Sequence, residues 1–203
     1  MIIETLLDKT PPNSAVIGLH GYTGDEHVLK PVIIGIKSHH TKWFIPRAPY
    51  KNLNGQGNTW FTGNDSDGWK FQDSFDLLNE LLTQILSEGF PKEKIFILGF
   101  SQGACLAMDF MVRMSFPIGG IIPIAGFIKY SERFKHDATN QSKNTPVHLF
   151  HGEKDHIVPF NESENSMELF SSLGYDVSLT PYKAKHKIST RIMQSIRFIL
   201  EKE

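Results

Sequence analysis

Residues 94–111 read KIFILGFSQGACLAMDFM. The first seven residues are almost entirely apolar, which is typical of a strand buried on both faces, and the residues from 102 onward are compatible with a helix. Between them lies Gly99-Phe100-Ser101-Gln102-Gly103, a GxSxG motif at a strand-to-helix turn. Such a turn projects a serine hydroxyl beyond the end of a sheet, so Ser101 is a candidate nucleophile.

The same alternation of strand and helix continues on both sides of this stretch. Further buried strands are predicted at 15–20, 42–46, 120–126, 147–152 and 176–180, and helices at 25–38, 72–88, 102–115, 161–173 and 187–201. Because parallel neighbours need a crossover connection, this pattern predicts an α/β protein with a mostly parallel, twisted sheet and helices on both faces. Two stretches, 47–70 and 129–146, are predicted to be long loops, and loops of this size are often functional.

Length and composition restrict the class of protein. At 203 residues a single domain over 1–203 is expected. The chain has 21 Lys and Arg against 22 Asp and Glu, a formal charge of −1, which argues against nucleic acid or an anionic membrane as a partner. One cysteine favours a reducing compartment, and the acidic Glu4 argues against a signal peptide, so we expect a cytoplasmic protein without an integral membrane segment.

A nucleophilic serine needs a base to take its proton and a carboxylate to orient that base. Asp155 follows the strand predicted at 147–152, and His186 follows the last predicted strand. The order Ser, Asp, His is the order expected for this kind of site. All three residues follow the carboxyl ends of parallel strands, the edge at which open α/β sheets place their sites. Ser101, Asp155 and His186 are therefore the predicted catalytic triad.

Other assignments within the same region remain open to test. The chain has nine histidines, of which His156 is the main competitor for the base, and Glu153 is a weaker rival for the acid. A metal site built from His148, His151 and His156 has little support, because no cysteine or carboxylate spacing completes it. The predicted chemistry requires no metal and no cofactor.

Catalysis by such a triad also needs hydrogen-bond donors for the developing oxyanion. We assign these to the backbone amides of Gln102, which follows the nucleophile, and Tyr22, which lies in the loop after the first predicted strand. Trp60, Phe61 and Phe127 are candidates for lining a substrate pocket, with core packing as the alternative. We expect Cys105 to be a packing residue rather than a nucleophile.

The segments LHGYTG (19–24), APY (48–50), GFSQGA (99–104) and HGEKDHIVP (151–159), followed by a late histidine, occur in an informative order. They resemble the phospholipase/carboxylesterase family, which includes the acyl-protein thioesterases. The resemblance covers nearly the whole chain. It implies an α/β-hydrolase fold without a large cap domain, the triad and oxyanion amides assigned above, and hydrolysis of carboxylic esters or thioesters.

Two positions depart from the family pattern. Lys185 stands where the family usually has glycine before the histidine, and Ala125 stands where a serine often follows the strand. A lysine at a position needing positive φ would be strained, so a catalytically impaired protein that binds a ligand or partner is the rival hypothesis. The sequence leaves open whether the substrate is a small ester, a lysophospholipid or an acyl-protein, and whether the protein is a homodimer.

Overall fold

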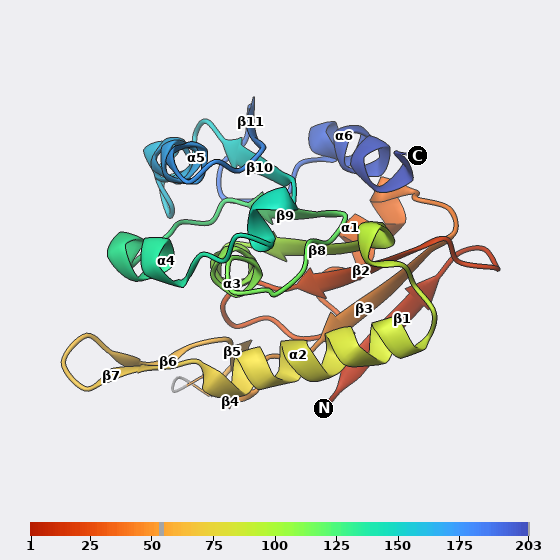
Figure 1. The fold of residues 1–203 in the computed structure, drawn as a ribbon, viewed down its shortest axis with the longest axis horizontal. Helices are drawn as coiled ribbons and strands as arrows, with labels where there is room; N and C mark the ends of the chain where they lie inside the picture. Colours follow the sequence, from red (N-terminus) through yellow and green to blue (C-terminus); the bar gives the residue numbers. More distant parts are fainter. Residues whose placement is uncertain (53–54, 203) are drawn as a thin grey trace.

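The computed structural model describes residues 1–52 and 55–202 and is built around a central sheet (Figure 1). Its strands lie in the order β1-β3-β2-β8-β9-β10-β11. They are β1 (Ile3–Leu7), β2 (Ser14–Leu19), β3 (Thr41–Pro46), β8 (Ile95–Phe100), β9 (Gly120–Ile124), β10 (Val147–Gly152) and β11 (Val177–Tyr182). Neighbouring strands are parallel except β1 and β3, which pair antiparallel at one edge. The predicted mostly parallel α/β sheet is confirmed.

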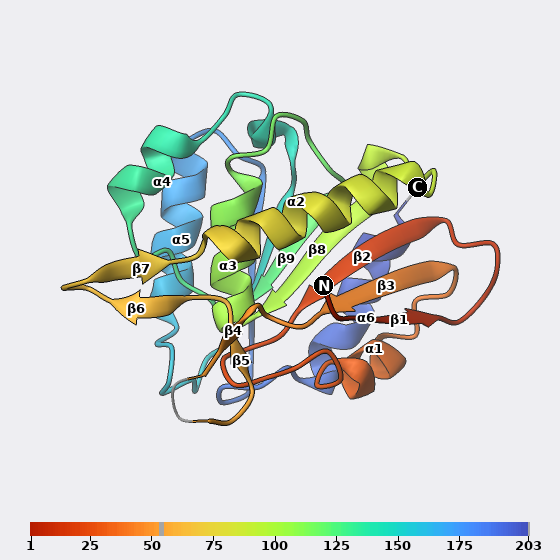
Figure 2. The same ribbon diagram turned by 90° about the horizontal axis from the view of Figure 1, so that it is seen from below.

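Helices cover both faces of the sheet. One face carries α2 (Gln72–Ser87), α3 (Gln102–Met111) and α5 (Asn161–Ser172), and the other carries α1 (Lys30–Ile36) and α6 (Thr190–Glu201). Figures 1 and 2 show α1 and α6 side by side. Each face has its own apolar cluster, because alternate residues of a strand point in opposite directions.

Strand β2 illustrates how the sheet separates these two clusters. Its side chains are all buried, as expected for a strand with parallel neighbours and a helix layer on each face. Ala15 and Ile17 belong to the cluster under α2 and α3, whereas Val16 between them belongs to the cluster under α1 and α6. The continuous apolar run in the sequence therefore reflects burial on both sides.

The predicted helices differ from the observed ones mainly at their ends. The helix expected at 25–38 is shorter at both ends: α1 spans Lys30–Ile36, and residues 26–29 form turns. Pro31 lies in the first turn of α1, where a missing N–H costs no hydrogen bond. The helix expected at 102–115 ends at Met111. Strand β1 was not predicted, since a short, partly exposed edge strand lacks the continuous apolar run of the central strands.

The two stretches predicted to be loops contain secondary structure of their own. Residues 129–146 include a short helix, α4 (Ser131–Asp137). Residues 47–70 include two hairpins, β4 (Tyr50–Lys51) with β5 (Asn58–Thr59) and β6 (Thr62–Asn64) with β7 (Gly68–Lys70), while positions 53 and 54 lie outside the described residues. No helix among the described residues is long and apolar enough to cross a membrane.

Candidate active site

Ser101 lies on a sharp turn between the end of β8 and the start of α3. Its backbone has φ 54° and ψ −116°, a conformation that a residue with a side chain rarely adopts. The two motif glycines make the turn sterically possible. A Cβ on Gly99 would lie 2.3 Å from the carbonyl oxygen of Gly103, and a Cβ on Gly103 would lie 2.3 Å from that of Leu19. The GxSxG pattern is therefore required by close backbone packing around the serine.

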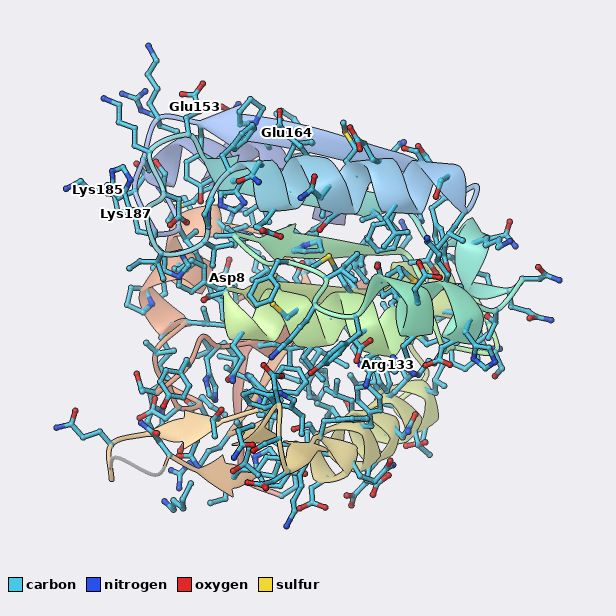
Figure 3. The ribbon with its side chains drawn as sticks, turned by 90° about the vertical axis from the view of Figure 1, so that its left-hand side faces the viewer. Asp8, Arg133, Glu153, Glu164, Lys185 and Lys187 are labelled. Carbon is cyan, nitrogen blue, oxygen red and sulfur yellow. The ribbon has the colours of Figure 1, made fainter. Side chains whose placement is uncertain are left out.

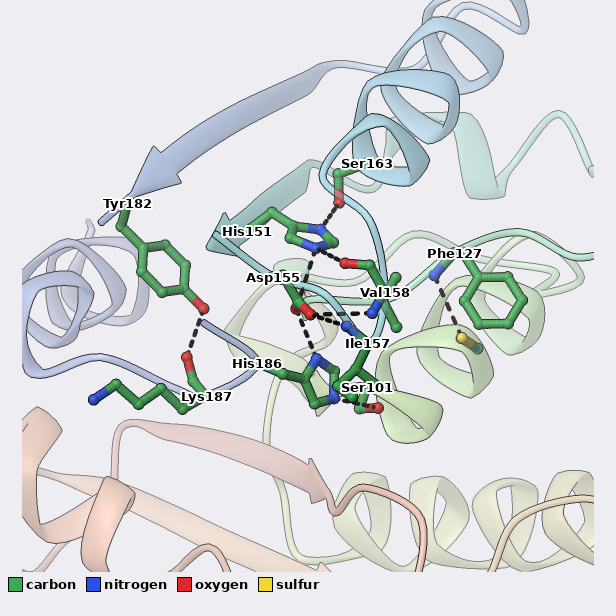
Figure 4. A network of polar contacts seen from close by, with 11 residues as sticks. Ser101, Phe127, His151, Asp155, Ile157, Val158, Ser163, Tyr182, His186 and Lys187 are labelled. Atoms are coloured by element: carbon green, nitrogen blue, oxygen red, sulfur yellow. Dashed lines mark hydrogen bonds and ion pairs between the residues drawn. The ribbon is translucent and has the colours of Figure 1, made fainter. Parts of the chain in front are cut away.

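The structure brings Ser101, Asp155 and His186 together from three different loops (Figure 4). His186 Nε2 lies 2.9 Å from Ser101 Oγ, and His186 Nδ1 lies 2.7 Å from Asp155 Oδ2. The ring of Phe100 packs against the ring of His186 with centroids 4.9 Å apart. These distances form a continuous hydrogen-bonded line from hydroxyl to imidazole to carboxylate.

The Asp155 carboxylate is fully buried and yet well supplied with donors. Its Oδ1 accepts hydrogen bonds from the backbone N–H groups of Ile157 at 2.9 Å and Val158 at 3.0 Å. Burial acts to raise the pKa of Asp155, but the hydrogen bonds from His186 and the two amides outweigh it and hold the pKa below its usual value. Asp155 is therefore ionised at neutral pH and can stabilise a protonated His186.

The alternative acid and base lie away from this line. His156 is exposed, and Glu153 is also exposed, as Figure 3 shows. The Glu153 backbone N–H donates to the carbonyl of Tyr182, which fixes the chain but leaves the Glu153 carboxylate at the surface. Among the candidates weighed from the sequence, the structure places His186 within hydrogen-bond reach of Ser101, and Asp155 within hydrogen-bond reach of His186.

The two proposed oxyanion donors come from neighbouring strands, β2 and β8. Across the described residues, neither the backbone N–H of Tyr22 nor that of Gln102 donates a hydrogen bond to another protein group. The Gln102 N–H is one of the donors left free at a helix N-terminus. In the Tyr22 loop, the Thr23 N–H donates to Asn58 O at 3.0 Å and the Gly24 N–H to Gly21 O at 3.1 Å. The loop is thus held by its other amides.

The side chain of Gln102 has a positioning role that the sequence analysis missed. Gln102 Oε1 accepts the backbone N–H of Trp60 at 3.0 Å, and Gln102 Nε2 donates to the Thr59 hydroxyl at 2.8 Å. These contacts tie the N-terminus of α3 to the segment after β5. No sequence signal identifies them, because the partners are more than 40 residues apart.

A cavity of about 370 Å³ lies beside Ser101. Aromatic side chains from two segments make much of its wall: Phe61, Trp69 and Phe71 on one side, and Phe127, Tyr130 and Phe134 on the other. Of the residues predicted to line a pocket, Phe61 and Phe127 do so. Trp60 does not: it is fully buried in the core, and its Nε1 donates to the carbonyl of His20 at 2.8 Å. The core alternative is therefore correct for Trp60.

Asp65 links the β6-β7 hairpin to residues 129 and 130 on the other side of the cavity. Asp65 Oδ1 accepts from Lys129 Nζ at 2.7 Å, Trp69 Nε1 at 2.8 Å and the Tyr130 hydroxyl at 3.0 Å. These hydrogen bonds, the one from Lys129 foremost, lower the pKa of Asp65 to about 2. Asp65 thus joins two segments that are far apart in the sequence.

Cys105 also lines the cavity, one helical turn after Ser101. Its Sγ accepts the backbone N–H of Phe127 at 3.4 Å, and burial raises the pKa of the thiol to about 12. A thiol in this state is a poor nucleophile, which agrees with the role expected for it.

The lysine that departs from the family pattern is not strained. Lys185 is exposed, as Figure 3 shows, and it is not among the described non-glycine residues with positive φ. The positive value falls instead on Ala125, with φ 53°, which is buried beside β9. Lys185 therefore needs no strained backbone, and the reason for the catalytically impaired alternative does not hold.

Comparisons with known proteins agree with this geometry. Acyl-protein thioesterase 1 of Gibberella zeae is 29% identical over 154 residues, which are 75% of this chain and 63% of that protein. Acyl-protein thioesterase 1 of Kluyveromyces lactis is 27% identical over 178 residues, 80% of this chain and 78% of that protein. The match to the first of these thus spans less than two thirds of its length.

Solved structures share the fold. The crystal structure of SOBER1 from Arabidopsis thaliana has a TM-score of 0.83 at 21% identity, covering 93% of this chain and 97% of that one. The crystal structure of esterase PE8 has a TM-score of 0.85 at 24% identity, covering 97% and 96%. The family model described as phospholipase/carboxylesterase matches residues 2–203. The chain belongs to the phospholipase/carboxylesterase family.

Proposed function

We propose that this protein is a serine hydrolase that cleaves carboxylic esters or thioesters through an acyl-enzyme on Ser101, with residues 1–203 acting as one catalytic domain. The observation that carries the proposal is the line of hydrogen bonds from Ser101 Oγ through His186 to Asp155. The names of the relatives, acyl-protein thioesterase and carboxylesterase, support both classes of bond.

The reaction runs in two half-reactions. Ser101 Oγ attacks the acyl carbonyl carbon while His186 Nε2 takes the hydroxyl proton, and the protonated ring then gives that proton to the departing alcohol or thiol. A water molecule next attacks the acyl-enzyme, again losing its proton to His186, and Ser101 leaves with that proton restored. Asp155 stays ionised throughout and stabilises the positive ring. The products are a carboxylic acid and an alcohol or thiol.

The amides of Tyr22 and Gln102 serve as the oxyanion hole in this scheme. Both lack a protein acceptor among the described residues and both lie at the edge of the sheet that holds Ser101. Removing one such donor typically costs about 2.7–4 kcal/mol of transition-state stabilisation. Gln102 adds the positive end of the α3 dipole. Substitution of its side chain by Ala leaves the amide in place but releases the anchors to Thr59 and Trp60.

The cavity beside Ser101 suits the acyl part of the substrate. Ser101, Cys105 and Asp109 all line it and stand four residues apart on α3, so the cavity follows the helix for about 12 Å at 1.5 Å per residue. At Asp109 the lining becomes charged, because Arg133 Nη2 donates to Asp109 Oδ2 at 2.9 Å. Burying a hydrocarbon chain against aromatic rings is favourable, but desolvating a charged pair is not. A medium-length apolar acyl chain therefore fits best.

The leaving group is less restricted than the acyl chain. A small alcohol, a lysophospholipid or a thiol of an acylated protein each presents the same acyl carbonyl to Ser101. The lone cysteine and near-zero net charge favour action in the cytoplasm on a substrate other than nucleic acid. Whether the protein acts as a monomer or a homodimer does not alter the reaction.

The test is a panel of p-nitrophenyl esters and matched thioesters of increasing chain length, run on the wild type, Ser101→Ala and Phe127→Ala. Ser101→Ala abolishes turnover and labelling by a fluorophosphonate, whereas the control Ser195→Ala on the exposed face of α6 leaves both unchanged. Phe127→Ala changes the chain-length preference. Fluorophosphonate labelling that persists in Ser101→Ala would overturn the assignment.

A further inference from the structure

A second histidine lies on the other side of the triad carboxylate. His151 is in β10 and is fully buried, and its ring packs edge-on against Phe160 with centroids 5.7 Å apart. From the sequence, His151 was considered as a metal ligand, with little support. Figure 4 shows its ring between Ser163 and the Asp155 turn, so that Asp155 stands between two histidines.

The contacts of His151 fix which ring nitrogen carries its proton. His151 Nε2 lies 2.9 Å from the carbonyl oxygen of Val158, which can only accept, so Nε2 carries the hydrogen. His151 Nδ1 lies 2.6 Å from the hydroxyl of Ser163, a buried residue of α5. In the neutral ring, Nδ1 carries no hydrogen and accepts a hydrogen bond from the Ser163 hydroxyl. His151 therefore presents one N–H group toward the turn that bears Asp155.

The same nitrogen also lies near the carboxylate oxygen that orients the base. His151 Nε2 lies 3.4 Å from Asp155 Oδ2, the same oxygen that is 2.7 Å from His186 Nδ1. The other oxygen, Oδ1, is held by the amides of Ile157 and Val158. One carboxylate oxygen of Asp155 is thus held by amides of its own turn, and the other lies between the imidazole rings of His151 and His186.

We propose that His151 is a positioning residue of the hydrolytic site, whose Nε2–H holds the Asp155 turn through Val158 O and moderates the charge that Asp155 Oδ2 presents to His186. This inference rests on the proposed function. It requires an N–H donor at the Nε2 position rather than a ring of a given size. Removing the donor loosens the turn, which lowers kcat, and leaves Oδ2 more negative toward a protonated His186.

The sign of the pH effect follows from that change in charge. A more negative Oδ2 stabilises the protonated form of His186, so the acid limb of kcat/KM moves to higher pH. Other ionisable groups on the elements packed around the site are the same in every variant; they are Glu153, Lys154 and His156 in the Asp155 turn, Glu162 and Glu164 of α5, Tyr182 of β11, and Lys185 and Lys187 beside His186. Only the donor at residue 151 differs between the enzymes compared.

The test compares His151→Gln, whose side-chain amide reaches the Nε2 position, with His151→Asn and His151→Phe, which place no donor there. We expect kcat of the Gln variant within about 3-fold of the wild type, and kcat of the Asn and Phe variants lower by roughly 10-fold, as for removal of one partner of a buried hydrogen bond. In those two variants the acid limb moves to higher pH and KM changes little. The matched control is His148→Gln, on the same strand, where His148 Nδ1 lies 3.2 Å from Ser178 Oγ.

Three results would overturn the inference. The first is that His151→Phe keeps the wild-type kcat and acid limb. The second is that kcat falls equally in His151→Gln and His151→Asn, and the third is that kcat falls while the acid limb stays at the wild-type pH. Thermal denaturation of each variant identifies any that fail to fold, and the Gln and Asn pair then carries the comparison. Failure of the proposed function is distinguishable, because it appears as absent turnover in the wild type or retained turnover in Ser101→Ala.

Discussion

The backbone at Ser101 leads to a prediction about stability that is independent of turnover. With φ 54° and ψ −116°, Ser101 occupies a conformation that is costly for any residue with a Cβ. Ser101→Ala and Ser101→Gly both remove the 2.9 Å hydrogen bond to His186 Nε2. They differ only in the Cβ. The difference between them therefore reports the strain at the turn.

Two terms set the expected magnitude. Relief of a sparsely populated backbone conformation is worth about 1–3 kcal/mol. The greater conformational freedom of glycine in the unfolded chain lowers the free energy of unfolding by about 0.4–1 kcal/mol relative to alanine. The free energy of unfolding of Ser101→Gly is therefore expected to be about 1 kcal/mol larger than that of Ser101→Ala. In a domain of this size that corresponds to a rise in Tm of roughly 2–4 °C.

The assay is urea denaturation followed by circular dichroism, with thermal unfolding as a second measurement. The matched control is Ser195, an exposed residue within α6. In a helix interior, glycine is less stable than alanine by about 1 kcal/mol, so the sign of the Gly-minus-Ala difference is opposite at the two sites. If Ser101→Gly is less stable than Ser101→Ala, as at Ser195, the turn stores no strain and the reasoning fails.

Three further predictions concern other parts of the molecule. Burial lowers the pKa of His20, so as the pH falls below about 6.5 the unfolded chain takes up a proton at His20 before the folded protein does, and the free energy of unfolding decreases. Urea denaturation between pH 7.5 and 5.5 should therefore show a smaller decrease in His20→Gln than in the wild type. Gly103→Ala lowers the free energy of unfolding by at least about 2 kcal/mol in the same assay, since its Cβ would lie 2.3 Å from Leu19 O; Gly174→Ala, at a positive φ but with open space around it, costs less. Cys105 resists iodoacetamide at pH 8 in the native protein and reacts in 8 M urea, which mass spectrometry measures; rapid native labelling would contradict the raised pKa of its thiol.

The central sheet and the triad were predictable because both depend on short-range patterns. Continuous apolar runs identify the parallel strands, and the residues just after such strands meet at one edge. Ser101, Asp155 and His186 each follow a strand, so their convergence required no knowledge of long-range contacts. The turn at Ser101 was also predictable, since GxSxG between a strand and a helix is a local sequence pattern.

The walls of the site were not predictable in the same way. Whether Trp60 faces a cavity or the core depends on its bond to the carbonyl of His20, 40 residues earlier. The β6-β7 hairpin is held by Asp65 through contacts with residues more than 60 positions later. His151 is held by Ser163, 12 residues later and in another element. Such contacts depend on the packed structure, and no local pattern announces them.

The fastening of the β6-β7 hairpin by Asp65 has a consequence for how this scaffold can change. The proposed nucleophile, base and acid follow strands of the central sheet, whereas much of the cavity beside Ser101 is walled by the hairpin and the segment leading into α4, both outside that sheet. Insertions or substitutions in these two segments alter the shape of the cavity without moving Ser101 or His186. Substrate range can therefore be redesigned, or drift during evolution, at positions that the chemical step does not constrain.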